Sequence, residues 1–193
     1  MTTGCDMLRH GPVTRDGNLE VVDRRRIELV EGADASWARQ PYHTAQGLNP
    51  EKARALVKRG IEAARRGAVR EIQAAAERAR EAGHETAACA VLVAGPMRDW
   101  SVDEILAVHF RMHKAEGVLF RDALLRAADG CGLRSVAISE KQLAEHAKGA
   151  LAIPAAALMK RLATLGKSAG PPWGKDQKDA ATAAMIGLQS RTR

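Results

Sequence analysis

The feature that most constrains the fold is an unbroken apolar run at residues 87–94 (AACAVLVA), placed between two long segments of helical periodicity. A strand that is buried on both faces reads as continuously hydrophobic, whereas a half-exposed strand alternates. The run therefore predicts a central strand with helices on both sides of its sheet. Gly95 and Pro96 follow directly and end the strand.

The flanking segments predict long helices. Residues 50–82 carry apolar side chains at helical spacing, start at Asn49-Pro50 and stop at Gly83. A second helix is expected over residues 102–128, and a short parallel strand follows it at 133–138. The other expected segments are a loop at 32–50, helices at 141–146, 154–165 and 175–188, and a loop at 166–174.

The N-terminal part predicts short strands. Residues 19–22 and 27–30 are rich in apolar side chains, the charged run 23–26 separates them, and a turn signal lies at residues 16–18. We therefore expect an α/β fold whose mixed sheet combines an antiparallel three-strand meander with two parallel strands, covered by helices. A single domain over residues 1–188 with a frayed tail at 189–193 completes this expectation.

Composition narrows the class of protein. The chain has 193 residues, of which 46% are hydrophobic, and this excludes a disordered chain. It contains no apolar run near the ~20 residues of a membrane helix, and its three cysteines are scattered, which favours a reducing, cytoplasmic location. A net charge of +7 favours DNA or RNA as partners, although aromatic residues, at 3%, are too few for base stacking.

The second expected helix carries the most informative polar group. His109, His113 and Glu116 are spaced i, i+4 and i+7 in the middle of its apolar face, where burial requires partners. One interpretation is a metal-ligand set, or a base held by a carboxylate, with Tyr42 and His43 of the preceding loop nearby. The alternatives are an internal hydrogen-bonded cluster without a ligand, or a helix face that only partly contacts the sheet.

Acidic residues mark both ends of the chain. Asp176 and Asp179 lie on one face at the start of the last expected helix, where carboxylates also stabilise a helix end. Lys175 and Lys178 beside them could contact phosphate or balance charge. Asp6 follows a very short candidate strand at the N-terminus.

Together these segments resemble the RNase H-like superfamily, and within it the RuvC-type Holliday-junction resolvases. The match rests on Gly4-Cys5-Asp6, the long helix with the buried strand after it, His113-Lys-Ala-Glu-Gly-Val, and Asp176-Gln-Lys-Asp-Ala. The resemblance implies that Asp6, Asp176 and Asp179 hold Mg²⁺ or Mn²⁺ ions, which activate water for phosphodiester cleavage. It further implies a homodimer. The basic residues expected to contact nucleic acid are Lys175, Lys178 and Arg9.

The sequence departs from the family at the end of the buried strand. The family's glutamate falls near Ala94, so Asp99, Asp103 or Glu116 would have to replace it. Three functions therefore remain open. They are a metal-dependent nuclease for structured nucleic acid, a catalytically inactive RNase H-like domain that binds nucleic acid or protein, and an unrelated activity at His43, His109, His113 and Glu116.

Overall fold

A computed structural model describes residues 19–32 and 35–189 of the chain. Its sheet, within these residues, consists of two parallel strands, β1 (Ala88–Val93) and β2 (Arg134–Ser139), paired from Ala88 with Arg134 to Val93 with Ser139. The connection between them passes through helices α4 (Val102–Leu106) and α5 (His109–Gly130), as a parallel pair requires. The predicted pairing of these two strands is confirmed.

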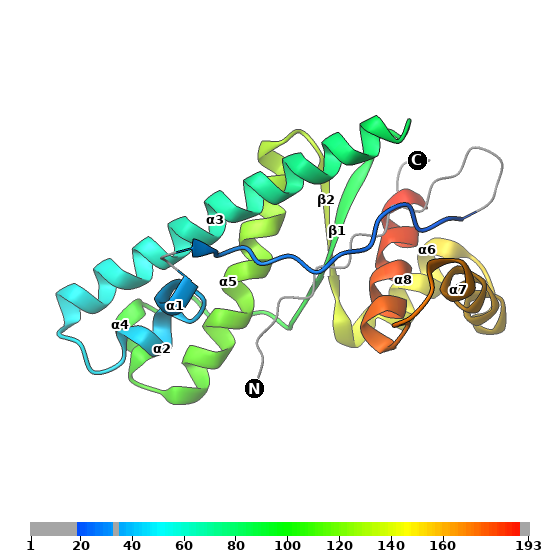
Figure 1. Cartoon of the computed structure of the whole chain (residues 1–193). Coiled ribbons are helices and arrows are strands. Elements are labelled where there is room, and N and C mark those ends of the chain that lie inside the picture. The colour runs from blue at the N-terminus through cyan, green and yellow to red at the C-terminus, as the bar shows by residue number, and fades with distance from the viewer. Residues whose placement is uncertain (1–18, 33–34, 190–193) are drawn as a thin grey trace.

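Helices cover both faces of this sheet (Figure 1). One side holds the long helix α3 (Pro50–Glu81), with α5 against it and the short α1 (Ala35–Ala38), α2 (Pro41–Ala45) and α4 nearby. The other side holds α6 (Leu143–Leu151), α7 (Ala155–Ala169) and α8 (Lys175–Gln189), after the 3₁₀ turn η2 (Glu140–Gln142). We call helices α1–α5 the first lobe and helices α6–α8 the second lobe.

The alternation of side chains along β1 gives each lobe its own core. Val91 is buried in the first core, whereas Ala90 and Leu92 pack against the second. At Gly187 of α8 an added Cβ would lie 3.4 Å from the Cβ of Ala90, so α8 packs closely on the sheet. Both faces of β1 meet helices, which accounts for its continuous hydrophobic run. Within β1 only Val91 is buried and the other five residues are half-buried, so the predicted central strand, buried on both faces, is wrong for this two-stranded sheet.

The predicted antiparallel meander, and with it the RNase H-like mixed sheet, is wrong for the residues that the structure describes. Residues 19–22 and 27–30 form no strand but belong to one extended segment that crosses both lobes (Figure 1). Leu19 packs on the second core, and Leu29 and Val30 are buried in the first. Their apolar side chains therefore pack against helices, and an apolar pattern alone does not distinguish this from pairing in a sheet. The remaining expected strand lies before residue 19, outside the described residues.

The charged run at residues 23–26 ties the extended segment to both lobes. The guanidinium of Arg24 donates to the carbonyl oxygens of Gly170, Pro171 and Pro172 at 3.0, 2.9 and 2.6 Å, between α7 and α8. The neighbouring Asp23 accepts a hydrogen bond of 3.1 Å from Arg78 on α3. These charges therefore hold the two lobes together instead of forming a turn between strands.

Two glycines of α3 let other segments approach its backbone. A Cβ at Gly67 would lie 1.7 Å from the carbonyl oxygen of Leu29, and a Cβ at Gly60 would lie 2.4 Å from the Cβ of Pro41. Neither distance is compatible with a side chain, so glycine is needed at both positions. Gly67 seats the extended segment, and Gly60 seats α2.

Several helix boundaries differ from the predicted ones. The expected helix at 102–128 is divided at Ala107 and Val108 into α4 and α5, and the expected loop at 32–50 contains α1 and α2. α7 continues to Ala169, whereas α3 and α8 match their predicted ranges closely. Among the described residues, helices that combine the length and hydropathy required to cross a membrane are not found.

Candidate metal centre

Three histidines from two helices meet in the first lobe. His43 lies on α2, and His109 and His113 occupy the first two turns of α5. Their ring centroids are 4.5–5.3 Å apart, and the Nε2 atoms of His109 and His113 are separated by 3.0 Å. One nitrogen from each ring lies within 4.8 Å of the others. The spacing i, i+4 on α5 thus brings together the pair that the sequence indicated.

The burial of this group differs from the prediction. Glu116 is buried, with 3% of its surface exposed, but His109 and His113 are exposed. Met112 and Ala115 take the innermost positions on this side of α5. The two histidines therefore lie at the edge of the apolar face, where a metal ion or water can reach them.

Packing of α2 on α3 places the third histidine. Pro41 begins α2 and rests against Gly60 of α3, and Tyr42 is buried beside it. His43 follows them and faces α5. The sequence placed His43 near the cluster but in a loop. Proline is common at the first position of a helix, so Pro41 was the signal that could have indicated α2.

Glu116 joins the histidine cluster to the core. Its Oε1 accepts a hydrogen bond of 3.2 Å from the backbone N–H of His43, and its Oε2 lies 2.9 Å from the Nδ1 of that residue. Burial, and then the negative charge of Glu116, raise the pKa of the Tyr42 phenol above its usual value of 10.0. Glu116 therefore accepts a backbone N–H from the first turn of α2 and contributes to the raised pKa of Tyr42.

The two ring nitrogens of His43 are buried polar atoms without a hydrogen bond among the described residues. Its Nδ1 is close to the Glu116 carboxylate, although the contact lacks hydrogen-bond geometry, and its Nε2 has no hydrogen-bond partner among the described residues. Both atoms are buried. Leaving a buried polar atom without a partner costs about 1–3 kcal/mol. The Nδ1 edge of the ring faces Glu116, so Nε2 is the nitrogen that a metal ion would satisfy.

The dimensions suit a tetrahedral metal ion. Nitrogen ligands at ~2.0–2.1 Å from such an ion lie about 3.3 Å apart. The separation of 3.0 Å between His109 and His113 is close to this value. The widest separation, up to 4.8 Å, requires small rotations of exposed rings. Three imidazoles would fill three positions and leave the fourth open to solvent.

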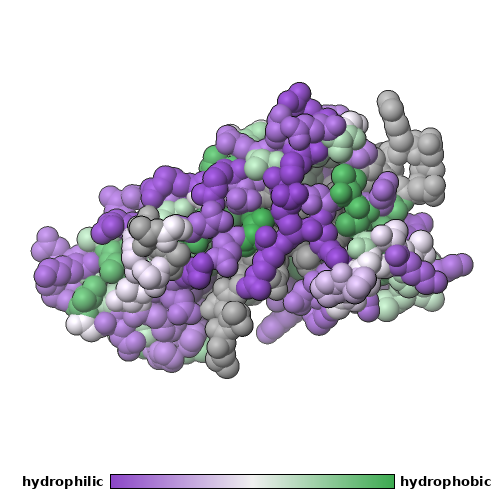
Figure 2. Space-filling view, in the orientation of Figure 1, coloured by the Kyte–Doolittle hydropathy of each residue, from purple (hydrophilic) through white to green (hydrophobic). Residues whose placement is uncertain are grey.

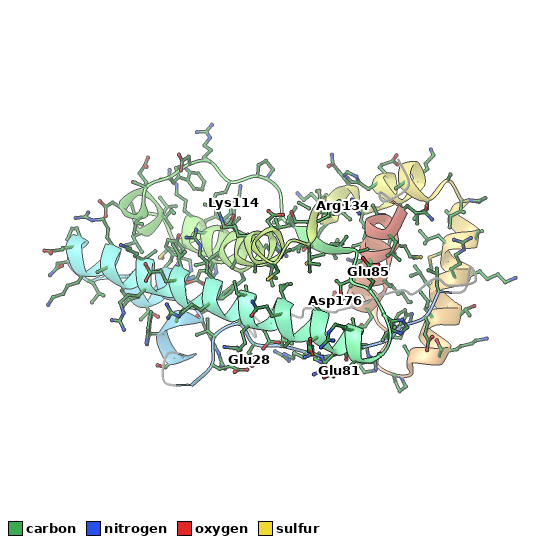
Figure 3. All side chains as sticks on the ribbon, turned by 90° about the horizontal axis from the view of Figure 1, so that it is seen from above. Glu28, Glu81, Glu85, Lys114, Arg134 and Asp176 are labelled. Atoms are coloured by element: carbon green, nitrogen blue, oxygen red, sulfur yellow. The ribbon has the colours of Figure 1, made fainter. Side chains whose placement is uncertain are left out.

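The acidic residues of the nuclease prediction do not join this cluster. Asp176 and Asp179 lie on α8 in the second lobe, and Asp179 pairs with Lys175 of the same helix. Figure 3 shows Asp176 at α8, apart from Lys114 of α5, the residue that follows His113 in the chain. Across the described ranges, the ligand-type side chains close enough to hold an ion are the three histidines. Asp6 and Arg9 lie outside the described residues, so the two-metal nuclease site stays a prediction.

Ala94, near which the resemblance would place a glutamate, follows the end of β1. Ala94 lines a small cavity of about 170 Å³ together with Gly95, Arg121 and Asp122. Both charged side chains already have partners, since Arg121 contacts Glu140 at 2.5 Å and Asp122 contacts Arg126 at 2.7 Å. The candidate substitute Asp103 likewise pairs with an arginine, Arg54 of α3, at 2.7 Å.

A scan of family models, a search of curated proteins and a search of solved structures give no match to this chain. The resemblance to RuvC-type resolvases therefore stays a prediction. The geometry of the histidine cluster carries the functional argument instead.

Proposed function

We propose that this protein binds a divalent transition-metal ion, in the first place Zn²⁺, through His43, His109 and His113. The observation that carries the proposal is the buried Nε2 of His43, which has no hydrogen-bond partner in the described structure and belongs to a ring 4.5 Å from that of His113. The Glu116 carboxylate lies 2.9 Å from the Nδ1 of His43, on the side where a carboxylate often stands behind a metal-binding imidazole.

The ligand type decides which metal fits. Imidazole nitrogen suits zinc, copper, iron and nickel, whereas magnesium and calcium prefer oxygen ligands. The cluster provides three imidazoles, and Glu116 faces the Nδ1 side of His43. Mg²⁺, the cofactor implied by the family resemblance, is therefore a poor fit here, and Zn²⁺ is a good one.

An open fourth coordination position would allow the metal ion to bind water or a substrate. Structural zinc sites use four protein ligands, whereas catalytic sites keep one position for water or substrate. The exposure of His109 and His113 leaves that position accessible. Bound Zn²⁺ would there lower the pKa of water and polarise a substrate oxygen, as in hydrolysis or hydration.

Metal binding is tested by titrating the chelator-treated full chain with ZnCl₂ and following metal content and thermal unfolding. We expect one Zn²⁺ per chain. A free metal concentration of one hundred times Kd adds about 2.7 kcal/mol to the free energy of unfolding. For a protein of this size the melting temperature then rises by roughly 5–11 °C. His109→Ala and His113→Ala should abolish the rise.

The control is His146→Ala, since His146 is an exposed histidine on α6 in the second lobe. It should bind Zn²⁺ like the unmodified chain. Without metal, all three variants should unfold within about 0.5 kcal/mol of the parent, because the side chains are exposed. The proposal is wrong if the parent binds none of Zn²⁺, Co²⁺ and Ni²⁺, or if His146→Ala loses binding as His113→Ala does.

A further inference from the structure

Helix α7 carries an uncompensated positive charge. Lys160, Arg161 and Lys167 lie on it, and its fifteen residues include no acidic side chain. Lys148 of the adjoining α6 adds a fourth cation. All four side chains are exposed.

The charge of α7 also differs from that of α3, which carries five glutamates among its cations. There, Arg54, Arg65 and Arg78 each contact an aspartate of another segment, at 2.7, 3.8 and 3.1 Å. By contrast, Lys148 and the three cations of α7 contact no carboxylate of the described residues. The charge of α7 is therefore available to an external anion.

The packing of α7 leaves most of its surface open. Leu162 and Leu165 are buried in the second core, and Gly166 lies against the ring of Trp173. On the outer side, Ala163 and Thr164 are small and exposed between Lys160 and Lys167. A long polymer could therefore approach the helix backbone closely between two positive side chains.

We propose that α7, with Lys148, docks on the phosphate backbone of double-stranded DNA. Neutralising phosphates with lysine and arginine releases counterions, which drives such binding. At 1.5 Å per residue, α7 is roughly 22 Å long and its two lysines are about 10.5 Å apart, near three base-pair steps along the duplex. An α-helix with its side chains is about 10–12 Å wide, which fits the ~12 Å major groove.

The residues of α7 favour nucleic acid over a membrane surface. Membrane-surface helices present large apolar side chains to the lipid, but Leu162 and Leu165 point into the protein core. Met159, at 57% exposure, is the large apolar residue that α7 does expose. The cations of α7 are assigned here to phosphates, which carry no sequence information, so we expect binding without sequence specificity. This inference does not rest on the metal centre.

Fluorescence anisotropy with the full chain and a labelled 20-base-pair duplex tests the proposal. Four phosphate contacts predict that log K falls with log salt concentration with a slope of about −3.6. The double variant K160E/K167E should weaken binding at least about tenfold and flatten the slope by about 2, since two contacts are lost. K160R/K167R, which keeps the charge, should bind like the parent.

The matched control is K52E/K58E, which makes the same charge change at exposed lysines of α3. It should leave the salt slope within about half a unit of the parent value. Circular dichroism and melting temperature show that each variant is folded. The proposal is overturned if the parent does not bind the duplex, if the α3 control loses as much affinity as the α7 variant, or if phosphatidylserine vesicles bind more tightly than DNA.

Discussion

The two lobes share one small sheet but differ in the charge of their helices: α3 mixes glutamates with its cations, whereas α7 has no acidic residue. In the first lobe, arginines of α3 face aspartates from other segments, and the buried Glu116 meets His43. In the second lobe, the three cations of α7 meet no described carboxylate, although Lys175 of α8 pairs with Asp179. Figure 2 shows hydrophilic residues on the surface of both lobes, so hydropathy alone does not distinguish the lobes.

The comparison changes the meaning of the net charge of +7. Cations that pair with acids inside the protein position its segments, as Arg78 does when it holds Asp23. Cations without such partners are free for an external polyanion. The net charge alone does not separate these two kinds of cation, whereas the structure shows that α7 carries three exposed cations and no acidic residue.

The close glycine contacts also differ between the lobes: Gly67 of α3 meets the backbone of Leu29, whereas Gly166 of α7 meets a side chain. Gly67→Ala tests this difference and should have the largest effect. The new Cβ would lie 1.7 Å from the carbonyl oxygen of Leu29, a backbone atom that cannot rotate away. We expect the free energy of unfolding to fall by about 3 kcal/mol or more in urea denaturation. Gly117→Ala, on α5 with no atom within 4 Å of the new Cβ, should instead stabilise by about 0.5–1 kcal/mol. Equal effects at the two sites would contradict the packing described for α3.

Gly166→Ala is the corresponding change in the second lobe and should have a smaller effect. Its Cβ would lie 2.3 Å from the Trp173 ring, but a side chain at this half-buried position can shift. We expect a loss of about 1–2 kcal/mol by the same measurement. Gly149→Ala on α6, with open space around it, is the control. A loss as large as that of Gly67→Ala would mean that the second lobe is packed as rigidly as the first.

Periodicity predicted the parts of the fold that depend on local pattern. The predictions of the long helix at 50–82 and of the parallel pair of strands were correct. Apolar side chains at helical spacing fit one face of a helix, and a continuous apolar run fits a strand that meets helices on both faces. The meander was wrong because residues 27–30 satisfy their apolar side chains against helices. That arrangement depends on Gly67, whose role becomes visible only when α3 and the extended segment meet.

The candidate site was predictable to the same extent. His109 and His113 share a helix, so their proximity follows from spacing i, i+4 alone. The contact between Glu116 and His43 spans 73 residues and depends on Pro41 resting on Gly60. No local pattern encodes that distance, which is why the sequence placed His43 nearby without assigning it to a carboxylate.

The smallest effect concerns the charge buried in the first lobe. Tyr42 is the chain's single tyrosine, so absorbance at 295 nm reports its ionisation alone. Burial and the charge of Glu116 raise its pKa, so the native protein should titrate above pH 10. Glu116→Gln should lower the midpoint but leave it above 10, because burial persists. K160E/K167E should leave it unchanged, since exposed charges beyond ~10 Å are screened at 0.1 M salt.

The same titration fixes the sign of the stability change at high pH. The unfolded chain loses the Tyr42 proton near pH 10, whereas the folded chain retains it to a higher pH. The contribution of Tyr42 is therefore fully present below pH 10 and is lost as pH rises through the raised pKa. Tyr42→Phe should remove this part of the alkaline decline. A native midpoint at or below 10, or one that Glu116→Gln raises, would show that the buried carboxylate does not act on Tyr42 and would remove the electrostatic contrast between the lobes.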